Sequence, residues 1–327
     1  MAVTKEKGNV SSNGVLAQVA SKARVSTGTV SRVFNNSSLI PSETRSRVLS
    51  AARELGFRPR VGVRSKQIAI VTEPPHKTVM GGYVNTLTQH ICYALSRLDA
   101  GITMITEDRI GNLADCWFDG VIGIAWEDRT IDILKKLNNI PMVWFSDNQA
   151  SWCHTVFSNC YTTGKLAGEY LIGRGHRRIA VIHETDYTGC GRAEGVRIAM
   201  REAGLNPDEL FVDLSSSLPL HVAVKQFIDA GCTAVWVPGE DMRVLEVNWL
   251  IQELVGKRVP EDISLLGSEN PGISEFQRPS LTTIAIPLHE MAEIAVDLVM
   301  QGDTNILRKI ELPSRLIERN SVSTQKQ

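Results

Sequence analysis

The sequence has no apolar run long enough to cross a membrane and no apolar N-terminal stretch of the kind a signal peptide needs. Charged residues are only 22% and aromatic residues only 6% of the 327, whereas 43% are hydrophobic. This balance is typical of a folded protein long enough to bury two or three cores. We therefore expect a cytoplasmic protein with disordered tails at residues 1–14 and 321–327.

Cysteine is too sparse and too scattered to form a disulfide framework or a metal site, because no CxxC pair and no histidine cluster occurs. We expect reduced thiols, no bound metal and no other cofactor. Three histidines, His154, His176 and His183, are expected to be partly exposed polar residues rather than bases or ligands. The six cysteines are Cys92, Cys116, Cys153, Cys160, Cys190 and Cys232.

The sequence also lacks the motifs of common enzymes, such as GxSxG, HExxH and the P-loop. The nearest is RIAVIHETDYTGCGRAEG, a predicted strand before GxGxxxG, with Asp213 about twenty residues on, which imitates a dinucleotide-binding fingerprint. Its first glycine, Gly189, stands too far beyond the strand, and its third comes one place late. An NAD-binding enzyme is therefore a minor alternative, as is a transport-type solute-binding protein. We expect no enzymatic activity.

Charge is instead divided very unevenly along the chain. Residues 1–66 hold twelve Lys or Arg against three Glu, a net charge of +9. The rest of the chain therefore carries −10, because the total is −1. A small basic segment joined to a large acidic body predicts that the first part binds a polyanion and that the second has another task.

The spacing of apolar residues in 15–58 predicts three short helices around one small core. The first is expected to begin at about Leu16, and the second begins where Ser26 can cap it. On the second helix the apolar positions are Val30, Val33 and Phe34.

The other positions of the second helix place hydroxyls and one cation on its outward side. Hydroxyls and helix-end N–H groups bind phosphate oxygens, and arginine can donate two hydrogen bonds to guanine. This combination predicts a recognition helix in the major groove of DNA. The outward residues are Ser26, Thr27, Gly28, Thr29, Ser31 and Arg32.

The stretch VLAQVASKARVSTGTVSRVFNNSSLIPSETRSRVLSAARELGFRP resembles the N-terminal helix-turn-helix of the LacI/GalR family of repressors. It follows the family pattern of V-A, A-G-V-S, T-V-S-R-V-x-N and a third helix ending in G-[YF]-x-P nearly throughout. The resemblance implies that Thr27, Gly28 and Arg32 contact bases. It places Ser26, Thr29, Ser31 and Asn35 on the phosphate side. We also count Leu16 among the DNA-contacting residues.

Two features depart from the family pattern near the head. Arg24 stands where the family usually has a turn glycine, which costs on the order of 1 kcal/mol if φ there is positive. The linker of residues 59–66 is short and basic, and its glycine and β-branched valines disfavour the hinge helix usual in the family. We expect an extended linker on phosphates or a narrow minor groove; a blunt valine wedge is the alternative. Its predicted contacts are Arg60, Val61 and Arg64.

From Gln67 onward, near-continuous apolar strands alternate with helices, which predicts parallel sheets covered on both faces. So many strands favour two doubly wound lobes, with a ligand cleft at the carboxyl ends of the strands. The predicted strands are QIAIVT, ITMIT, GVIGIA, PMVWF, RIAVI, LFVDL, TAVWV, ISLLG and LTTIA. The predicted helices lie around 83–98, 130–138, 162–173, 190–203, 219–230, 241–255 and 288–301.

Blocks such as GKLAGEYLIGRGHRRIAVI and RPSLTTIAIPLHEMAEIAVDLV resemble the periplasmic-binding-protein-like effector domain of the same family. The resemblance implies an N-terminal three-helix helix-turn-helix domain plus an α/β two-lobed domain of two doubly wound parallel sheets. The effector-binding and dimerisation domain spans 67–320, with no leucine heptads after it, so a homodimer is expected. Lobe 1 covers about 67–157 and 286–311, and lobe 2 about 158–285 and 312–320.

A sugar-binding cleft needs a bidentate arginine, carboxylates and an aromatic face. The resemblance places Arg192 at the effector-binding arginine, with a surface salt bridge as the alternative. Tyr83 and Trp126 lie near strand-end loops, and we expect both to line the cleft. At the positions where the family usually has cleft Asp or Asn residues, this chain has different side chains. A ligand smaller or more basic than a sugar is therefore the alternative. The residues there are Ser146, Asp147, Glu240, Asp241 and Glu269.

The first lobe is shortened on one side, because residues 109–119 leave room for about two turns where the family has a full helix. The sequence as a whole predicts a cytoplasmic, dimeric transcriptional regulator, a repressor, that binds a pseudo-palindromic double-stranded operator. A small molecule between the lobes, a sugar or sugar derivative, is expected to control it.

Overall fold

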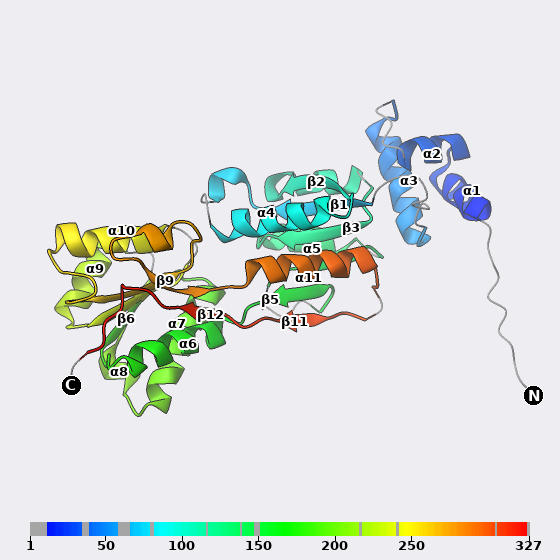
Figure 1. Ribbon diagram of the computed structural model, residues 1–327. Coiled ribbons are helices and arrows are strands. Elements are labelled where there is room, and N and C mark those ends of the chain that lie inside the picture. Colours follow the sequence, from blue (N-terminus) through cyan, green and yellow to red (C-terminus); the bar gives the residue numbers. More distant parts are fainter. Residues whose placement is uncertain are drawn as a thin grey trace, which may run out of the picture.

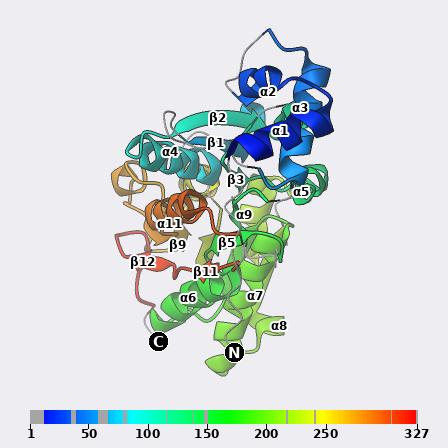
Figure 2. The same cartoon turned by 90° about the vertical axis from the view of Figure 1, so that its right-hand side faces the viewer.

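A computed structural model shows a small helical head followed by two α/β lobes (Figure 1). Figure 2 shows the head, in blue, at one end of the first lobe. Within the part of the chain described, no helix is long and apolar enough to cross a membrane. The described residues are 12–34, 39–57, 66–78, 82–115, 117–137, 139–146, 151–215, 218–239, 242–304 and 306–325.

The head consists of α1 (Ser12–Ala23), α2 (Thr27–Phe34) and α3 (Ser42–Glu54), packed around one core. As predicted, Ser26 caps α2, since its Oγ accepts a hydrogen bond from the Thr29 N–H at 3.1 Å. The apolar positions of α2 are all buried, so the opposite side of this helix faces outward.

The first helix begins earlier than predicted, at Ser12. Val15 and Leu16 pack against the head core, and this burial supports the extra turn. The predicted disordered tail is therefore wrong for residues 12–14, which are helical.

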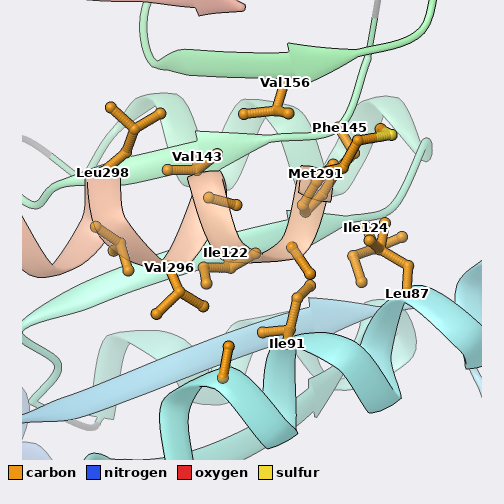
Figure 3. Close-up of a cluster of buried hydrophobic side chains, with 14 of the residues drawn as sticks. Leu87, Ile91, Ile122, Ile124, Val143, Phe145, Val156, Met291, Val296 and Leu298 are labelled. Atoms are coloured by element: carbon orange, nitrogen blue, oxygen red, sulfur yellow. The ribbon is translucent and has the colours of Figure 1, made fainter. Parts of the chain in front are cut away.

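Lobe 1 is a six-stranded, fully parallel sheet with the order β11-β5-β4-β3-β1-β2. Helices α4 and α11 cover one face of it, and η2 and α5 cover the other. Figure 3 shows the first of these cores, with Leu87 and Ile91 of α4 and Met291 of α11 packed near Ile122 and Ile124 of β3. Its elements are β1 (Gln67–Thr72), η1 (Pro75–Lys77), α4 (Tyr83–Ser96), β2 (Gly101–Thr106), η2 (Glu107–Asp115), β3 (Gly120–Ile124), α5 (Asp128–Lys135), β4 (Met142–Trp144), β5 (His154–Phe157), α11 (Leu288–Gln301) and β11 (Lys309–Glu311).

Lobe 2 repeats the plan with the order β12-β10-β9-β8-β6-β7, in which only β12 is antiparallel to its neighbour. Helices α6 and α7 cover one face, and α9 and α10 cover the other. Its elements are α6 (Cys160–Gly173), β6 (Ile179–His183), α7 (Tyr187–Glu202), α8 (Pro207–Leu210), β7 (Phe211–Ser215), α9 (Leu220–Asp229), β8 (Ala234–Val237), α10 (Arg243–Trp249), η3 (Leu250–Leu254), β9 (Ser264–Ser268), η4 (Ser274–Phe276), β10 (Thr282–Ala285) and β12 (Arg315–Ile317).

The predicted fold class is confirmed, and each of the nine predicted strands overlaps a strand of the structure. No separate strand was predicted for β5 or β11, because neither makes a clear apolar run. Strand β12 lies in the C-terminal segment, 312–320, that was assigned to lobe 2. The chain crosses between the lobes three times, after β5, β10 and β11.

The predicted C-terminal tail is wrong for residues 321–325, which pack on lobe 2. Ser321 is fully buried, and its carbonyl oxygen accepts a hydrogen bond from the Leu265 N–H at 2.8 Å. Further on, the Gln325 N–H donates to the Arg174 carbonyl at 2.8 Å. These backbone bonds extend the edge of the lobe beyond the predicted boundary.

Replacing Arg24 with glycine should stabilise the head by about 0.5–1 kcal/mol. Arg24 has φ of 54°, a left-handed conformation that costs a residue with a side chain on the order of 1 kcal/mol. Hydrogen exchange of the buried α2 amides should slow in Arg24→Gly. Asp99→Gly, at a lobe 1 residue with φ of 51°, is the matched control and should leave α2 unchanged. Faster α2 exchange in Arg24→Gly would contradict the expectation.

Candidate functional site

The outward face of α2 is polar and open to solvent. Thr29 is half-buried, and its hydroxyl lies 2.9 Å from the Ser26 hydroxyl. Leu16 of α1 packs partly against the head core. The exposed residues at this end of the head are Ser26, Thr27, Gly28, Ser31 and Arg32. The other predicted DNA contacts, Asn35, Arg60, Val61 and Arg64, lie outside the described residues.

A cavity of about 760 Å³ lies between the two lobes and is lined by both. Its volume lies in the range of small-molecule sites. Its walls form where parallel strands end, so a ligand there contacts both sheets at their carboxyl edges. The strand-end residues are Glu73 after β1, Phe145 and Ser146 after β4, Ser158 after β5, Glu184 after β6, Gly239 after β8 and Ile286 after β10.

Aromatic side chains form part of the cavity wall. The Tyr83 and Trp126 rings lie with centroids 6.3 Å apart and planes inclined by 47°. Trp126 is 44% exposed, so much of its apolar face is open to a ligand ring. Tyr187, which also lines the cavity, meets Tyr161 edge-on at 6.4 Å.

Arg192 brings a buried cation to the cavity from α7. This helix is capped by Asp186, whose carboxylate accepts a hydrogen bond from the Gly189 N–H at 2.7 Å. A Cβ at Gly164 of α6 would overlap the Arg192 carbonyl, so only glycine allows so close a helix crossing. Arg192 is 8% exposed and lines the cavity, which disfavours the surface salt bridge. Its planar donors suit bidentate bonds to hydroxyl or carboxylate oxygens.

Carboxyl groups gather around one lysine on the lobe 1 wall. Lys77 pairs with Glu127 at 2.7 Å, and the Glu127 N–H donates to the Glu107 carboxylate at 2.9 Å. Burial and the nearby negative charge of Glu107 raise the pKa of Glu73. The positive charge of Lys77 lowers it by less, so the pKa stays above its ordinary value. Glu73 therefore holds its proton more tightly in the folded protein than in the unfolded chain.

The three histidines are buried rather than partly exposed, at 2%, 0% and 4% for His154, His176 and His183. Each has both ring nitrogens within hydrogen-bond distance of a partner, and this satisfies the buried polar atoms. Because both nitrogens are engaged, these rings are poorly placed to act on a ligand. The partners are Asp303 and Arg308 for His154, Thr233 and Ser323 for His176, and Asp213 and Glu184 for His183.

Four predicted effector contacts, Tyr83, Trp126, Ser146 and Arg192, line the cavity. Glu269 does not, and that expectation is corrected. The Glu269 carboxylate accepts hydrogen bonds from Arg319 at 2.8 and 2.9 Å and from the Thr283 hydroxyl, so it belongs to a half-buried ion pair. Three further predicted contacts, Asp147, Glu240 and Asp241, lie outside the described residues.

The sequence analysis missed several polar residues that line the cavity. They all lie within five residues after the end of a predicted strand, and this strand-end position was the available signal. Within the described residues, no group of three or more His, Cys, Asp or Glu side chains could hold a metal ion. The missed residues are Glu73, Lys77, Glu184, Asp186 and Tyr187.

The chain is similar over most of its length to known regulators. Residues 15–60 match the family of bacterial regulatory proteins described as the lacI family, and residues 169–322 match the periplasmic binding protein-like domain. The HTH-type transcriptional repressor PurR of Salmonella newport is 30% identical over 339 residues, which cover 94% of this chain and 96% of that protein.

Two solved structures show the same architecture. The transcriptional regulator CelR in complex with cellobiose has a TM-score of 0.68 at 25% identity, covering 94% of this chain and 99% of that one. The lac repressor dimer bound to operator and the anti-inducer ONPF has a TM-score of 0.67 at 23% identity, covering 93% and 98%.

Glu73→Gln should raise the melting temperature at pH 7 by about one to two degrees. The pKa of Glu73 is raised in the folded protein, so the stability it contributes is present below its unfolded pKa and is lost as pH rises through the folded value. Glutamine imitates the neutral form. The gain should therefore vanish at pH 4. Exposed Glu253→Gln is the control, and an unchanged melting temperature for Glu73→Gln at pH 7 would contradict this.

Proposed function

The chain belongs to the lacI family of bacterial regulatory proteins, and from that premise we propose that it is a repressor controlled by a small molecule bound between its lobes. The observation that carries the proposal is the presence, in one chain, of an outward polar helix face and a cavity lined by both lobes. A ligand that binds both lobes stabilises one arrangement of them over others. Because the head is joined to lobe 1, this difference in binding free energy can change its affinity for DNA.

The same geometry supports binding rather than catalysis at the cavity. The glycines that imitate a dinucleotide fingerprint lie inside α7 rather than in a turn after β6. A Cβ at Gly191 would meet the Cys160 sulfur, and one at Gly195 would meet the backbone of α6. Close helix packing therefore accounts for Gly191 and Gly195 without a cofactor, and the Glu184 carbonyl, which a Cβ at Gly189 would overlap, accounts for the first glycine.

We propose that two copies act together on a pseudo-palindromic operator in the cytoplasm. A closed two-fold pair presents two recognition helices to two half-sites. Large apolar side chains exposed on both lobes are available for burial between copies. They include Tyr93, Leu98 and Met104 on lobe 1 and Trp249, Leu254 and Phe276 on lobe 2.

We propose a sugar or sugar derivative as the effector. The open face of Trp126, with Tyr83 beside it, suits the apolar face of a sugar ring. Arg192 and the carboxylates at Glu73 and Glu184 suit its hydroxyl groups. The relative CelR is similar over the same length and is described with cellobiose.

Arg32→Ala should cost about 1–3 kcal/mol of specific binding and relax the preference at one base position. Arg32 is exposed on the outward face of α2, where its guanidinium can reach a base edge. A duplex selected from random-sequence DNA by the wild-type protein provides the probe. Arg201→Ala, an exposed helical arginine of lobe 2, should bind it normally. Equal losses on selected and random duplexes would assign Arg32 to a phosphate instead.

Arg192→Ala should weaken effector binding by about 2 kcal/mol, roughly thirtyfold, while operator binding stays intact. Arg192 lines the cavity and lies far from the head in the sequence. A thermal-shift screen of the wild-type protein against sugars and sugar acids first identifies a ligand. Titration of that ligand then compares Arg192→Ala with Arg201→Ala on the same helix. Normal affinity in Arg192→Ala would show that the arginine is structural.

A further inference from the structure

The head is not separate from the body, because a body residue completes its core. Trp117 lies between η2 and β3 of lobe 1, yet it packs among the head side chains and is only 5% exposed. Its ring meets Phe34 edge-on, with centroids 5.0 Å apart and planes inclined by 84°. Phe34 in turn contacts Phe57 at 5.6 Å. Aromatic pairs in this geometry attract one another beyond the effect of burial alone.

A second element of the head contacts the same part of lobe 1. Helix α3 packs against η2, and the Arg53 Nη2 donates a hydrogen bond to the Leu113 carbonyl at 3.3 Å. The space left between Arg53, Phe57 and Trp117 is only about 10 Å³, at most enough for a single water molecule. Head and lobe are therefore closely packed here.

The Trp117 segment is also tied to the place where the chain enters lobe 1. The Trp117 Nε1–H donates to the Asp119 carboxylate at 3.3 Å, and that carboxylate accepts the Gln67 N–H at 2.9 Å. Gln67 begins β1, directly after the linker. The residues between Phe57 and Gln67 reach at most about 35 Å, so the linker keeps the head at a high local concentration around its docking site.

At its other end, η2 reaches the cavity wall. It begins at Glu107, which is 1% exposed and whose carboxylate accepts the Glu127 N–H. Glu127 in turn holds Lys77, a lining residue of the cavity. Ile110 and Leu113 are fully buried in the lobe 1 core. Helix η2 is kinked at Arg109, where φ is −110° and ψ is 15°. The residues beyond the kink are held in one packed core, which resists gradual deformation, so a change at Glu107 is expected to move them together.

We propose that residues 107–115 and 117–119 form a coupling strap, through which the occupancy of the cavity controls whether the head stays docked on Trp117. This inference rests on the proposed function and assigns the route of its regulation. A ligand that engages Lys77 changes the charge balance that holds Glu127 and Glu107, and the resulting shift of η2 reaches Trp117. The docked head is the DNA-binding form, because the outward face of α2 remains exposed while the orientation of the head is already restricted.

The docking half of the proposal is tested on the full-length chain with Trp117→Ala and Trp117→Phe. Trp117→Ala should speed hydrogen exchange about tenfold in α3 and in η2, and should weaken binding to the selected duplex about tenfold. Trp117→Phe retains an aromatic ring and should recover most of both effects. Trp152→Ala removes a half-buried tryptophan of lobe 1 that lies away from the head and packs on Trp144, and it should behave as wild type.

If Trp117→Ala does not fold, Arg53→Met keeps the test open, because it removes only polar contacts and should speed exchange in the same direction. Wild-type exchange in α3 and η2 for folded Trp117→Ala, or for Arg53→Met in its place, overturns the docking.

The coupling half is tested without knowledge of the effector. Lys77→Met removes the cation at the cavity end of the strap and should speed exchange several-fold in both η2 and α3. Lys165→Met, which breaks a comparable ion pair with Glu202 on lobe 2, is the matched control. Exchange in α3 that matches wild type in Lys77→Met overturns the coupling. The exchange measurements on both halves need no DNA. Failure of the wild-type protein to select any duplex therefore counts against the proposed function and not against the strap.

Discussion

Burial of both faces of two parallel sheets is the constraint on which the rest of the structure depends. Every residue of β3 (Gly120–Ile124) and of β6 (Ile179–His183) is buried. Parallel strands require crossovers, and helices on both faces complete the burial. The carboxyl ends of the strands then share one edge in each lobe. Because the chain crosses between lobes three times, these two edges face one another across the cavity.

Close helix packing in lobe 2 places the main cation of the cavity. Helices α6 and α7 approach so closely that side chains at Gly164 and Gly195 would overlap the facing backbone. This crossing brings the second turn of α7, with Arg192, to the cavity edge. Two of the glycines that resemble a phosphate-binding fingerprint in the sequence, Gly191 and Gly195, thus serve helix contact in the structure. The same glycine spacing fits a dinucleotide-binding turn and a close helix crossing, and only the neighbours in space distinguish the two explanations.

The shortened segment of lobe 1 is another feature that the sequence and the structure explain differently. From the sequence, residues 109–119 show only that a full helix does not fit. In the structure this short segment leaves Trp117 against the head, and it joins that contact to Glu107 beside the cavity. A longer helix would place different side chains at the head. The shortened segment supplies Trp117 to the contact between head and lobe 1. The short linker favours the same contact, because it limits how far the head can lie from lobe 1.

Local periodicity by itself determined the three helices of the head, the outward polar face of α2 and nine of the strands, because apolar spacing directly reports which side of an element is buried. The position of strand-end loops pointed to Tyr83 and Trp126, and the family resemblance pointed to Ser146 and Arg192. Only tertiary structure decided the partners of polar side chains. It paired Glu269 with Arg319, buried the three histidines between distant segments and placed Trp117 in the head. Such contacts join residues far apart in the chain, and nothing in the local pattern around either partner records the other.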